Sequence, residues 1–294
     1  MTDATDRSGL DRLIGELHPN LHRYCARMVG SAIDGEDVVQ EALVKAIEAF
    51  PGAPSIANPA GWLFRIAHNA ALDFLRRRAR QSSAHSGEDP DMIVDPIDVV
   101  ERRQAAAASL RSLMGLTVSE RSSVILMDVL GYSLEEIGDI LEATIPAVKA
   151  ALHRGRARLR ELADRPDDRP LPRLDDRERF RLSAYVDRFN ARDFEAVRDM
   201  LADEVRLELV ARTRLNGKRE VTTYFTNYAS MHDWHFVPGL VDARPAIIAR
   251  NPGDPAARPA YFVMLEWEGS QIAGIRDFRH ARYALEASEV FIDD

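Results

Sequence analysis

Arginines and polar side chains that could hold a polyanion are concentrated in two short segments of this chain. Residues 62–81 contain five arginines and one acid, and residues 146–165 contain six lysines or arginines and two acids. Each segment carries a net charge of +4, although the whole chain of 294 residues carries −8. Because guanidinium groups neutralise phosphates, two compact basic patches on an acidic chain favour local contacts with a nucleic acid. Two solvated helix faces would give the same charge pattern.

We expect residues 62–81 to form a helix whose two halves differ in chemistry. At about 100° per residue, Leu63, Phe64 and Ile66 fall on one half, which is typical of a side that packs into a core. The opposite half carries Arg65, Asn69 and Arg76, with Trp62 at its edge, and it leads into Arg77 and Arg78. These six residues are the candidate DNA contacts. Arginines bind phosphates, and aromatic and amide groups can stack on or hydrogen-bond to bases, so this face favours a nucleic-acid contact.

The second basic segment follows a pattern typical of a helix-turn-helix. Ser133 and Glu136 predict a capping box at the start of its first helix, and Pro146 suits the first position of its second helix. Apolar residues of the two helices can pack together: Ile137, Leu141, Val148, Leu152 and Leu159. The basic side chains left to face outward are Lys149, His153, Arg154, Arg156 and Arg160. This pattern alone would equally suit a LuxR-type regulator or another repressor.

The rest of the sequence indicates two helical domains followed by a mixed one. We expect two helices from Leu10 to Phe50, then a Pro-rich loop and the helix that begins at Trp62. A polar, acidic linker follows, and a second helical block runs from about Val99 to Ala163. Two short helices and then a series of strand-like runs predict an α+β domain at the C-terminal end. The predicted boundaries are 1–82 and 105–164 for two all-α domains, 83–104 and 165–176 for linkers, and 177–294 for the α+β domain.

Composition excludes fibrous, disordered and membrane-spanning classes. The chain is 46% hydrophobic and 29% charged, and it contains no run of about eighteen uncharged apolar residues. Without an apolar N-terminal run, the sequence predicts a cytoplasmic protein with no membrane partner. Cys25 is the single cysteine, which agrees with a reducing compartment. His18, His22 and Cys25 could present metal ligands on one helical side, but a fourth ligand is lacking, so we expect neither a metal nor a cofactor.

The order of motifs in residues 10–80 resembles region 2 of the extracytoplasmic-function (ECF) sigma factors of bacterial RNA polymerase. The resemblance is carried by "DGEDVVQEALVKAIEAFP", a Pro-rich loop and "NPAGWLFRIAHNAALDFLRRR". It implies that the acidic helix docks on the clamp helices of the polymerase β′ subunit, through Asp37, Gln40 and Glu41. It also implies that the loop and the next helix melt the minus-ten promoter element, with Asn69 and residues 50–60 as candidates to receive an unstacked base.

The segment "GLTVSERSSVILMDVLGYSLEEIGDILEATIPAVKAALHRGRARLREL" resembles sigma region 4, and it stands one linker after region 2, as in that family. Region 4 binds the minus-thirty-five element, and the β flap of the polymerase is its implied partner. The resemblance assigns Lys149, His153 and Arg154 to the major groove, and Arg156 and Arg158 to phosphates. Glu142 occupies a turn position where the family usually has glycine.

The C-terminal residues 177–294 resemble the SnoaL-like or NTF2-like cone, in which helices precede a curved sheet around a pocket. The phrases "YVDRFNARDFEAVRDMLADEVRLEL" and "AGIRDFRHARYAL" carry this resemblance. It implies pocket candidates at Tyr185, Tyr224, Trp267, Asp277 and His280, with His232, Asp233 and His235 as further polar groups. The fold includes enzymes that use an Asp or His base, but Asp277 and His280 could equally be ordinary polar residues.

We therefore expect an alternative sigma factor, not an enzyme, that binds core RNA polymerase and promoter DNA. The C-terminal cone is expected to contact the sigma regions within the chain and to adjust their activity, with an unknown small ligand as an option. Two alternatives stay open. One is a helix-turn-helix regulator that does not recruit polymerase, and the other is a cone that acts as a separate small-molecule enzyme or ligand sensor.

Overall fold

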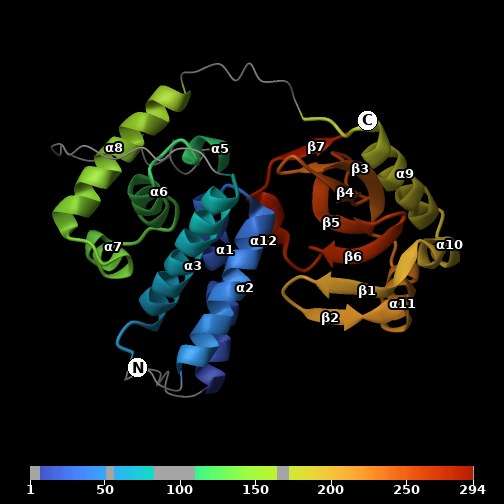
Figure 1. Ribbon diagram of the computed structural model, residues 1–294, viewed down its shortest axis with the longest axis horizontal. Helices are drawn as coiled ribbons and strands as arrows, with labels where there is room; N and C mark the ends of the chain where they lie inside the picture. The colour runs from blue at the N-terminus through green and yellow to red at the C-terminus, as the bar shows by residue number, and fades with distance from the viewer. Residues whose placement is uncertain (1–6, 51–55, 83–109, 164–171, 294) are drawn as a thin grey trace. The chain divides into compact units, whose positions relative to one another are not determined.

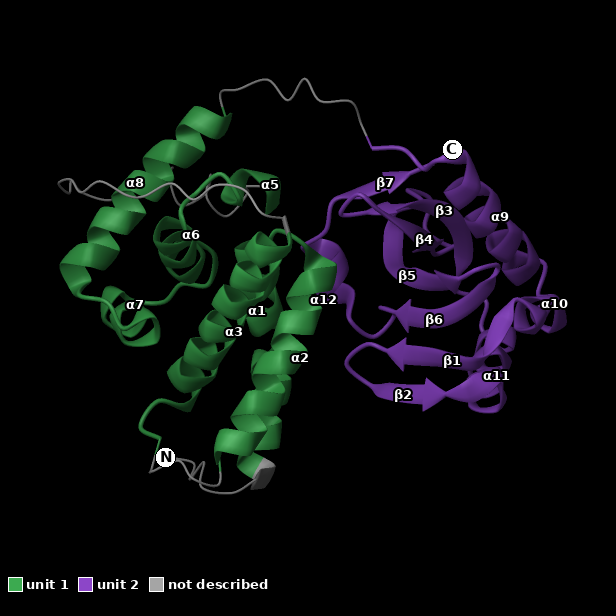
Figure 2. Ribbon diagram, in the orientation of Figure 1, with its two compact units in different colours: residues 1–168 green, residues 169–294 purple. Residues whose placement is uncertain are grey.

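The computed structural model describes residues 7–50, 56–82, 110–163 and 172–293, which form two compact units (Figure 2). Unit 1 comprises residues 1–168 and unit 2 comprises residues 169–294. The predicted linker at 83–104, and the part of the 165–176 linker before residue 172, lie outside the described residues. Each unit has its own buried apolar core.

Unit 1 begins with three helices, which confirms the prediction for this part of the chain (Figure 1). They are α1 (Arg7–Val29), α2 (Ala32–Ala49) and α3 (Pro59–Ser82). Between α1 and α2, Gly30 has a φ of 80°, which residues with a Cβ rarely adopt, and Ser31 caps α2 by accepting a hydrogen bond from Asp34 N. The start of α3 lies before Trp62, because the Asn58 side chain accepts from Gly61 N and Pro59 suits the first turn.

The second half of unit 1 contains the predicted helix-turn-helix. The Ser133–Glu136 capping box is confirmed, and a second capping box joins Thr117 and Glu120. The helix that begins at Val118 ends in a π-helical turn, in which Leu130 N donates to Ile125 O, five residues back. The elements are α5 (Leu110–Leu113), α6 (Val118–Val124), the π turn (Ile125–Val129), α7 (Leu134–Leu141) and α8 (Ile145–Ala163).

One apolar core joins the two helical halves of unit 1. The rings of Phe64 on α3 and Tyr132 before α7 meet edge to face, with centroids 5.1 Å apart. Arg121 of α6 is only 5% exposed and donates hydrogen bonds to Met28 O, near the end of α1, and to Leu116 O. These contacts satisfy carbonyls that would otherwise be buried without partners.

Unit 2 is an α+β domain, as the order of helices and strands predicts. Its seven strands form one sheet in the order β2-β1-β6-β5-β4-β3-β7, in which β1 and β6 are parallel and the other neighbours antiparallel. The helices are α9 (Asp176–Asn190), α10 (Phe194–Asp199), α11 (Gly217–Ala229) and α12 (Arg282–Glu286). The strands are β1 (Leu201–Leu209), β2 (Thr213–Asn216), β3 (His235–Val241), β4 (Arg244–Arg250), β5 (Pro259–Glu268), β6 (Gln271–Asp277) and β7 (Val290–Ile292).

Helix α11 is absent from the sequence-based prediction, although the sequence contains a signal for it. Val221, Tyr224, Phe225 and Tyr228 recur at helical spacing, and all four are buried. Figure 1 shows the strands β3 to β5 curving in unit 2, and α9 and α11 contribute aromatic rings to the core beside this sheet. Within the described part of the chain, no helix has the length and apolar content needed to span a membrane.

Candidate nucleic-acid interface

Helix α3 presents the predicted polar face to solvent. Asn69, Arg76, Arg77 and Arg78 are exposed, while Trp62 is half-buried at the edge of the apolar side. The side chains of Leu63 and Phe64, which the helical spacing assigns to the core, are buried and hold α3 against α1 and α2. The structure therefore places the candidate contacts on one helix whose opposite side is fixed by packing.

The arginines at the end of α3 form ion pairs at the surface. Arg77 donates two hydrogen bonds to the Glu41 carboxylate, at 2.7 and 3.4 Å, and Arg76 lies 3.3 Å from Asp73. The hydrogen bond from Arg77 lowers the pKa of Glu41. Exposed pairs of this kind contribute about 0–1 kcal/mol. An arginine can therefore leave its carboxylate for a phosphate at little cost.

The outward face of α2 combines acidic and apolar side chains. Asp37 is exposed, and Gln40 is half-buried and donates to Glu36 Oε1 at 2.9 Å. Val44 and Ile47 are 54% and 41% exposed, an unusual exposure for apolar side chains in the middle and last turns of a packed helix. The sequence analysis did not single them out, although they follow Asp37 at helical spacing.

Helix α8 buries the apolar residues assigned to its inner side and exposes part of its basic face. Val148, Leu152 and Leu159 are buried, whereas Lys149 and His153 are exposed. Arg154 is partly buried and its Nε lies 3.3 Å from Glu120 Oε1. Arg158 and Arg160 lie on the outer part of the helix, where Arg158 pairs with Glu161 at 2.8 Å.

The prediction that Arg156 faces outward is wrong. Its side chain is 4% exposed, and it donates two hydrogen bonds to Asp128, at 2.6 and 2.9 Å, while the Asp128 side chain is fully buried. The two residues form a bidentate ion pair between α8 and the π turn of residues Ile125–Val129. Arg156 follows Leu152 by four residues and precedes Leu159 by three, so it lies on the core side of α8.

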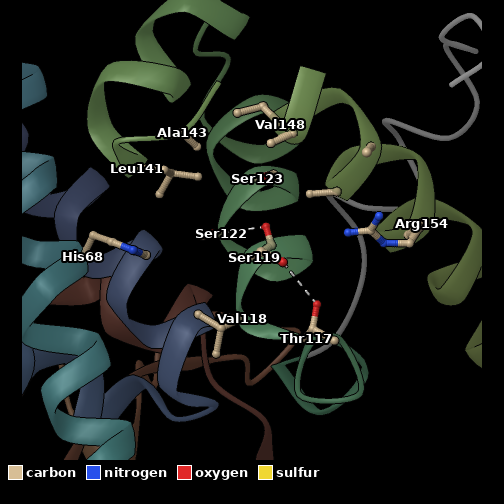
Figure 3. Close-up of a pocket in the computed structure, with 13 residues that line it drawn as sticks. His68, Thr117, Val118, Ser119, Ser122, Ser123, Leu141, Ala143, Val148 and Arg154 are labelled. Atoms are coloured by element: carbon tan, nitrogen blue, oxygen red, sulfur yellow. Dashed lines mark hydrogen bonds between the residues drawn. The ribbon is translucent and has the colours of Figure 1, made fainter. Parts of the chain in front are cut away.

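A cleft of about 640 Å³ lies within unit 1, between α3 and the helix-turn-helix (Figure 3). Figure 3 shows His68 of α3 on one side and Arg154 of α8 on the other, with Ser119 and Ser122 of α6 between them. His68 Nδ1 lies 2.7 Å from Tyr24 Oη, and burial lowers the pKa of His68 to about 4. The imidazole is therefore neutral near pH 7 and adds no positive charge to this cleft.

The residues considered as metal ligands contribute to the packing of α1. His22 donates from Nε2 to Ala32 O at 2.9 Å, and burial lowers its pKa to about 4. Cys25 is fully buried, which raises the pKa of its thiol. His18 Nε2 lies 3.5 Å from Glu36 Oε1. Among the residues described, no group of three or more His, Cys, Asp or Glu side chains is arranged to hold a metal ion.

In unit 2 the structure brings together three of the five predicted pocket residues. Asp277 is fully buried, and its Oδ2 accepts hydrogen bonds from Tyr224 at 3.0 Å and Tyr228 at 2.7 Å. Its Oδ1 accepts from the backbone N–H of Arg279 at 2.8 Å. Tyr185 is fully buried in the same core, where its hydroxyl has no hydrogen-bond partner among the described residues. Burial raises the pKa of Asp277.

The other candidates of unit 2 are half-buried or exposed. Trp267 is half-buried under the Arg181 guanidinium, 5.2 Å from the ring centroid. His280 is exposed, with its Nε2 3.3 Å from Arg212 Nη1, and Asp233 pairs with Arg279 at 2.7 Å. His232 and His235 are exposed. Of the five predicted residues, Tyr185, Tyr224 and Asp277 are buried, whereas Trp267 is half-buried and His280 is exposed.

A helix-turn-helix with exposed Lys149 and His153, together with the arginine-bearing helix α3, defines a DNA-binding protein. The family model for sigma-70 region 2 matches residues 13–81, and the model for sigma-70 region 4 matches residues 109–159. The ECF RNA polymerase sigma factor SigM of Mycobacterium tuberculosis is 32% identical over 159 residues, which cover 54% of this chain and 79% of SigM. SigW of Bacillus subtilis is 25% identical over 167 residues, covering 53% of this chain and 89% of SigW.

The chain belongs to the ECF RNA polymerase sigma factors. It is an alternative sigma factor that directs transcription. SigG of Mycobacterium tuberculosis, another ECF sigma factor, is 30% identical over 215 residues, which cover 63% of this chain and 57% of SigG.

The chain is also similar to solved structures, with low TM-scores. The sigma factor RpoE of Bartonella quintana, in complex with the anti-sigma factor NepR, is 25% identical with a TM-score of 0.40, covering 54% of this chain and 98% of that chain. The ECF sigma factor SigJ of Mycobacterium tuberculosis covers 90% of this chain and 95% of its own, at 18% identity and a TM-score of 0.37. An NTF2-like protein of Cytophaga hutchinsonii covers 34% of this chain and 96% of its own, at 17% identity and a TM-score of 0.27.

Proposed function

We propose that this sigma factor binds core RNA polymerase through the outward face of α2. The support is the exposure of Asp37 beside Val44 and Ile47, since a small apolar patch with a polar rim is typical of a protein interface. The partner surface is the β′ clamp helices, as the family resemblance implies, and the β flap is the partner of region 4. This role puts the protein in the bacterial cytoplasm, where polymerase and promoters are found.

Replacement of Val44 by Asp tests this surface. We expect at least a tenfold loss of affinity for purified core polymerase, because the patch would have to bury an unpaired carboxylate. Asp37→Ala should weaken binding less, and Glu16→Ala, which removes an exposed carboxylate from α1, should not change it. Binding is measured by pull-down and titration with labelled protein. Unchanged affinity in both α2 variants would disprove the proposed docking face.

The polar face of α3 is the proposed contact with the minus-ten element. The single observation that carries this role is the exposure of Asn69 and Arg76 on one face of a helix that is fixed from behind by its apolar half. Arg77 and Arg78 are exposed beside this face, where Arg78 also donates to Val29 O. The arginines bind phosphates, while Asn69, Trp62 and Arg65 lie on the part of the helix nearest the loop. Part of that loop, residues 51–55, lies outside the described residues.

The salt dependence of promoter binding checks the role of the arginines. We expect Arg76→Gln to reduce the slope of log K against log salt by about 1, because one phosphate contact is lost. Run-off transcription on a genomic library first identifies a promoter. The holoenzyme is then titrated with a labelled DNA fragment that contains this promoter. Arg12→Gln on α1 is the matched control, since Arg12 is exposed but lies outside the proposed interface. An equal slope for the two variants would remove Arg76 from the interface.

The recognition helix α8 is the proposed reader of the minus-thirty-five element. Lys149 and His153 are exposed for the major groove, and Arg154 lies beside them, although it also contacts Glu120. Arg158 is exposed enough to contact a phosphate once its surface pair with Glu161 opens. Arg156 is excluded from this set because its guanidinium is buried against Asp128.

We propose that unit 2 adjusts the output of the sigma regions and has no catalytic activity of its own. Both carboxylate oxygens of its buried acid, Asp277, accept hydrogen bonds from the protein, so the group is poorly suited to act as a base toward a substrate. Deletion of residues 177–294 should therefore change the amount of promoter transcript made with core polymerase. Unaltered transcription would favour a separate activity of unit 2, as an enzyme or as a ligand sensor.

A further inference from the structure

We propose that Ile145 reads a thymine methyl group in the minus-thirty-five element, and that Pro146 and Ala150 complete the apolar surface around it. The inference rests on the proposed role of α8 as the reader of that element, and it names the chemistry by which the bases are told apart. A recognition helix contacts base edges mainly through the residues at its N-terminal end. Helix α8 begins at Ile145, so the three residues lie in its first two turns.

One side of α8 is turned away from the core of unit 1. At about 100° per residue, positions 145, 146, 149, 150 and 153 follow one another along this side. Lys149 and His153 are its polar members, and both are exposed. Ile145 and Pro146 are also exposed, and Ala150 is half-buried. The side that faces the core is buried and consists of Val148, Ala151, Leu152 and Leu159.

Ile145 contributes little to the fold of unit 1. Its side chain is 38% exposed, and among the described residues it is not one of those packed on the core. The start of α8 is set by Thr144, whose Oγ1 accepts from Ala147 N at 3.4 Å and whose carbonyl accepts from Val148 N at 3.0 Å. Isoleucine is also a weaker helix former than alanine. Its apolar side chain is therefore available to a binding partner.

Pro146 removes a hydrogen-bond donor from the same end of α8. The first N–H groups of a helix have no partner within it, and they commonly bind phosphates. Proline has no N–H, and the N–H of Ala147 already donates to Thr144. The N-terminal end of α8 therefore presents mainly apolar groups to a DNA groove, and few donors.

Thymine is the base that matches this surface. In the major groove it presents a C5 methyl group, whereas guanine, adenine and cytosine present hydrogen-bond donors and acceptors. An apolar side chain distinguishes an A·T pair by contact with that methyl group. We therefore expect A·T pairs opposite Ile145, and polar contacts from Lys149 and His153 beside them.

Deoxyuridine tests the proposal, because it differs from thymidine only by the C5 methyl group and pairs in the same way. The holoenzyme is titrated with labelled duplexes that contain the promoter identified by run-off transcription, each with one thymine of the minus-thirty-five element replaced. At one position or more we expect affinity to fall about three- to fivefold, as for the loss of one buried methyl group. Replacement of a thymine upstream of the element should not change affinity.

The variant Ile145→Ala identifies the side chain that contacts the methyl group. At that position, the ratio of affinities for the thymine and uracil duplexes should fall close to one. Val118→Ala is the matched control, because Val118 is 39% exposed and also begins a helix, α6, but lies outside α8. Its ratio should equal that of the wild type. The melting temperature should not fall in Ile145→Ala, since alanine favours the helix.

Three results would overturn the proposal: a minus-thirty-five element without A·T pairs, no loss of affinity with any uracil duplex, or the same loss in wild type and Ile145→Ala. The last result would mean that uracil acts through the shape or stiffness of the DNA.

The variant Lys149→Gln separates these results from a failure of the proposed function. If α8 contacts the promoter, this variant should reduce the slope of log K against log salt by about 1. A reduced slope without any effect of uracil would refute methyl recognition only. An unchanged slope, also without an effect of uracil, would remove α8 from the promoter.

Discussion

Replacement of Arg156 by alanine should lower the free energy of unfolding of unit 1 by about 3–5 kcal/mol, because the buried carboxylate of Asp128 would lose its bidentate guanidinium partner. The carboxylate accepts two hydrogen bonds from this guanidinium, and the side chains are 0% and 4% exposed. A loss of this size is a large part of the stability of an ordinary domain. Urea unfolding with hydrogen exchange resolved along the chain would assign the loss to α8 and its neighbours.

The control for Arg156→Ala is Arg158→Ala, two positions along the same helix. Arg158 forms an exposed pair with Glu161, so its removal should cost at most about 1 kcal/mol. A double variant, Asp128→Leu with Arg156→Met, should recover most of the loss, since an apolar pair of similar size can replace a buried ion pair. If Arg156→Ala were as stable as Arg158→Ala, the burial of this pair would not describe the protein in solution.

Replacement of Asp277 by alanine should have the second large effect: we expect it to lower the free energy of unfolding of unit 2 by about 2–5 kcal/mol. Two buried tyrosine hydroxyls, on Tyr224 and Tyr228, and the N–H of Arg279 would lose their acceptor, and a buried unsatisfied polar group costs about 1–3 kcal/mol. Tyr228 keeps a neighbour in Tyr261, whose hydroxyl lies 3.1 Å away, so the total is below the sum of three full penalties. Hydrogen exchange in α11 and β6 should show the loss.

Asp277→Asn separates the hydrogen bonds from the charge. The amide keeps an oxygen acceptor, so we expect a smaller loss than with alanine near neutral pH. Burial raises the pKa of Asp277 in the folded protein, so the folded state binds its proton more tightly than the unfolded state does. The contribution of this group to stability is therefore greatest below the unfolded pKa of about 3.9 and is lost as pH rises through the folded pKa.

The wild type should accordingly lose unfolding free energy relative to Asp277→Asn as pH rises from below 4. Subtraction is necessary because other carboxylates titrate in the same range with the opposite sign: the pKa of Asp233 is lowered by its hydrogen bond from Arg279. A difference that is independent of pH would mean that Asp277 is not buried as described.

Local sequence patterns predicted most of the helical architecture of unit 1. Capping boxes, apolar spacing and prolines act over about four residues, and these signals located α1 to α3 and the helix-turn-helix. Helical spacing also contained the signal for α11, but the sequence-based prediction assigned only strands to this part of the chain. The residues that carry this signal are buried: Val221, Tyr224, Phe225 and Tyr228. For Arg156, the spacing from Leu152 and Leu159 indicated the core side, but its positive charge favoured an outward orientation.

The sequence by itself determined that this protein carries two basic helical surfaces, a helix-turn-helix and an α+β domain, because charge, periodicity and capping are local properties. Only the tertiary structure decided which charged groups are available for binding. Asp128 and Arg156 are 28 positions apart, Arg65 and Glu142 are 77 apart, and Tyr224 and Asp277 are 53 apart. Burial and pairing depend on the partner that folding brings within about 3 Å, and no local pattern specifies that partner.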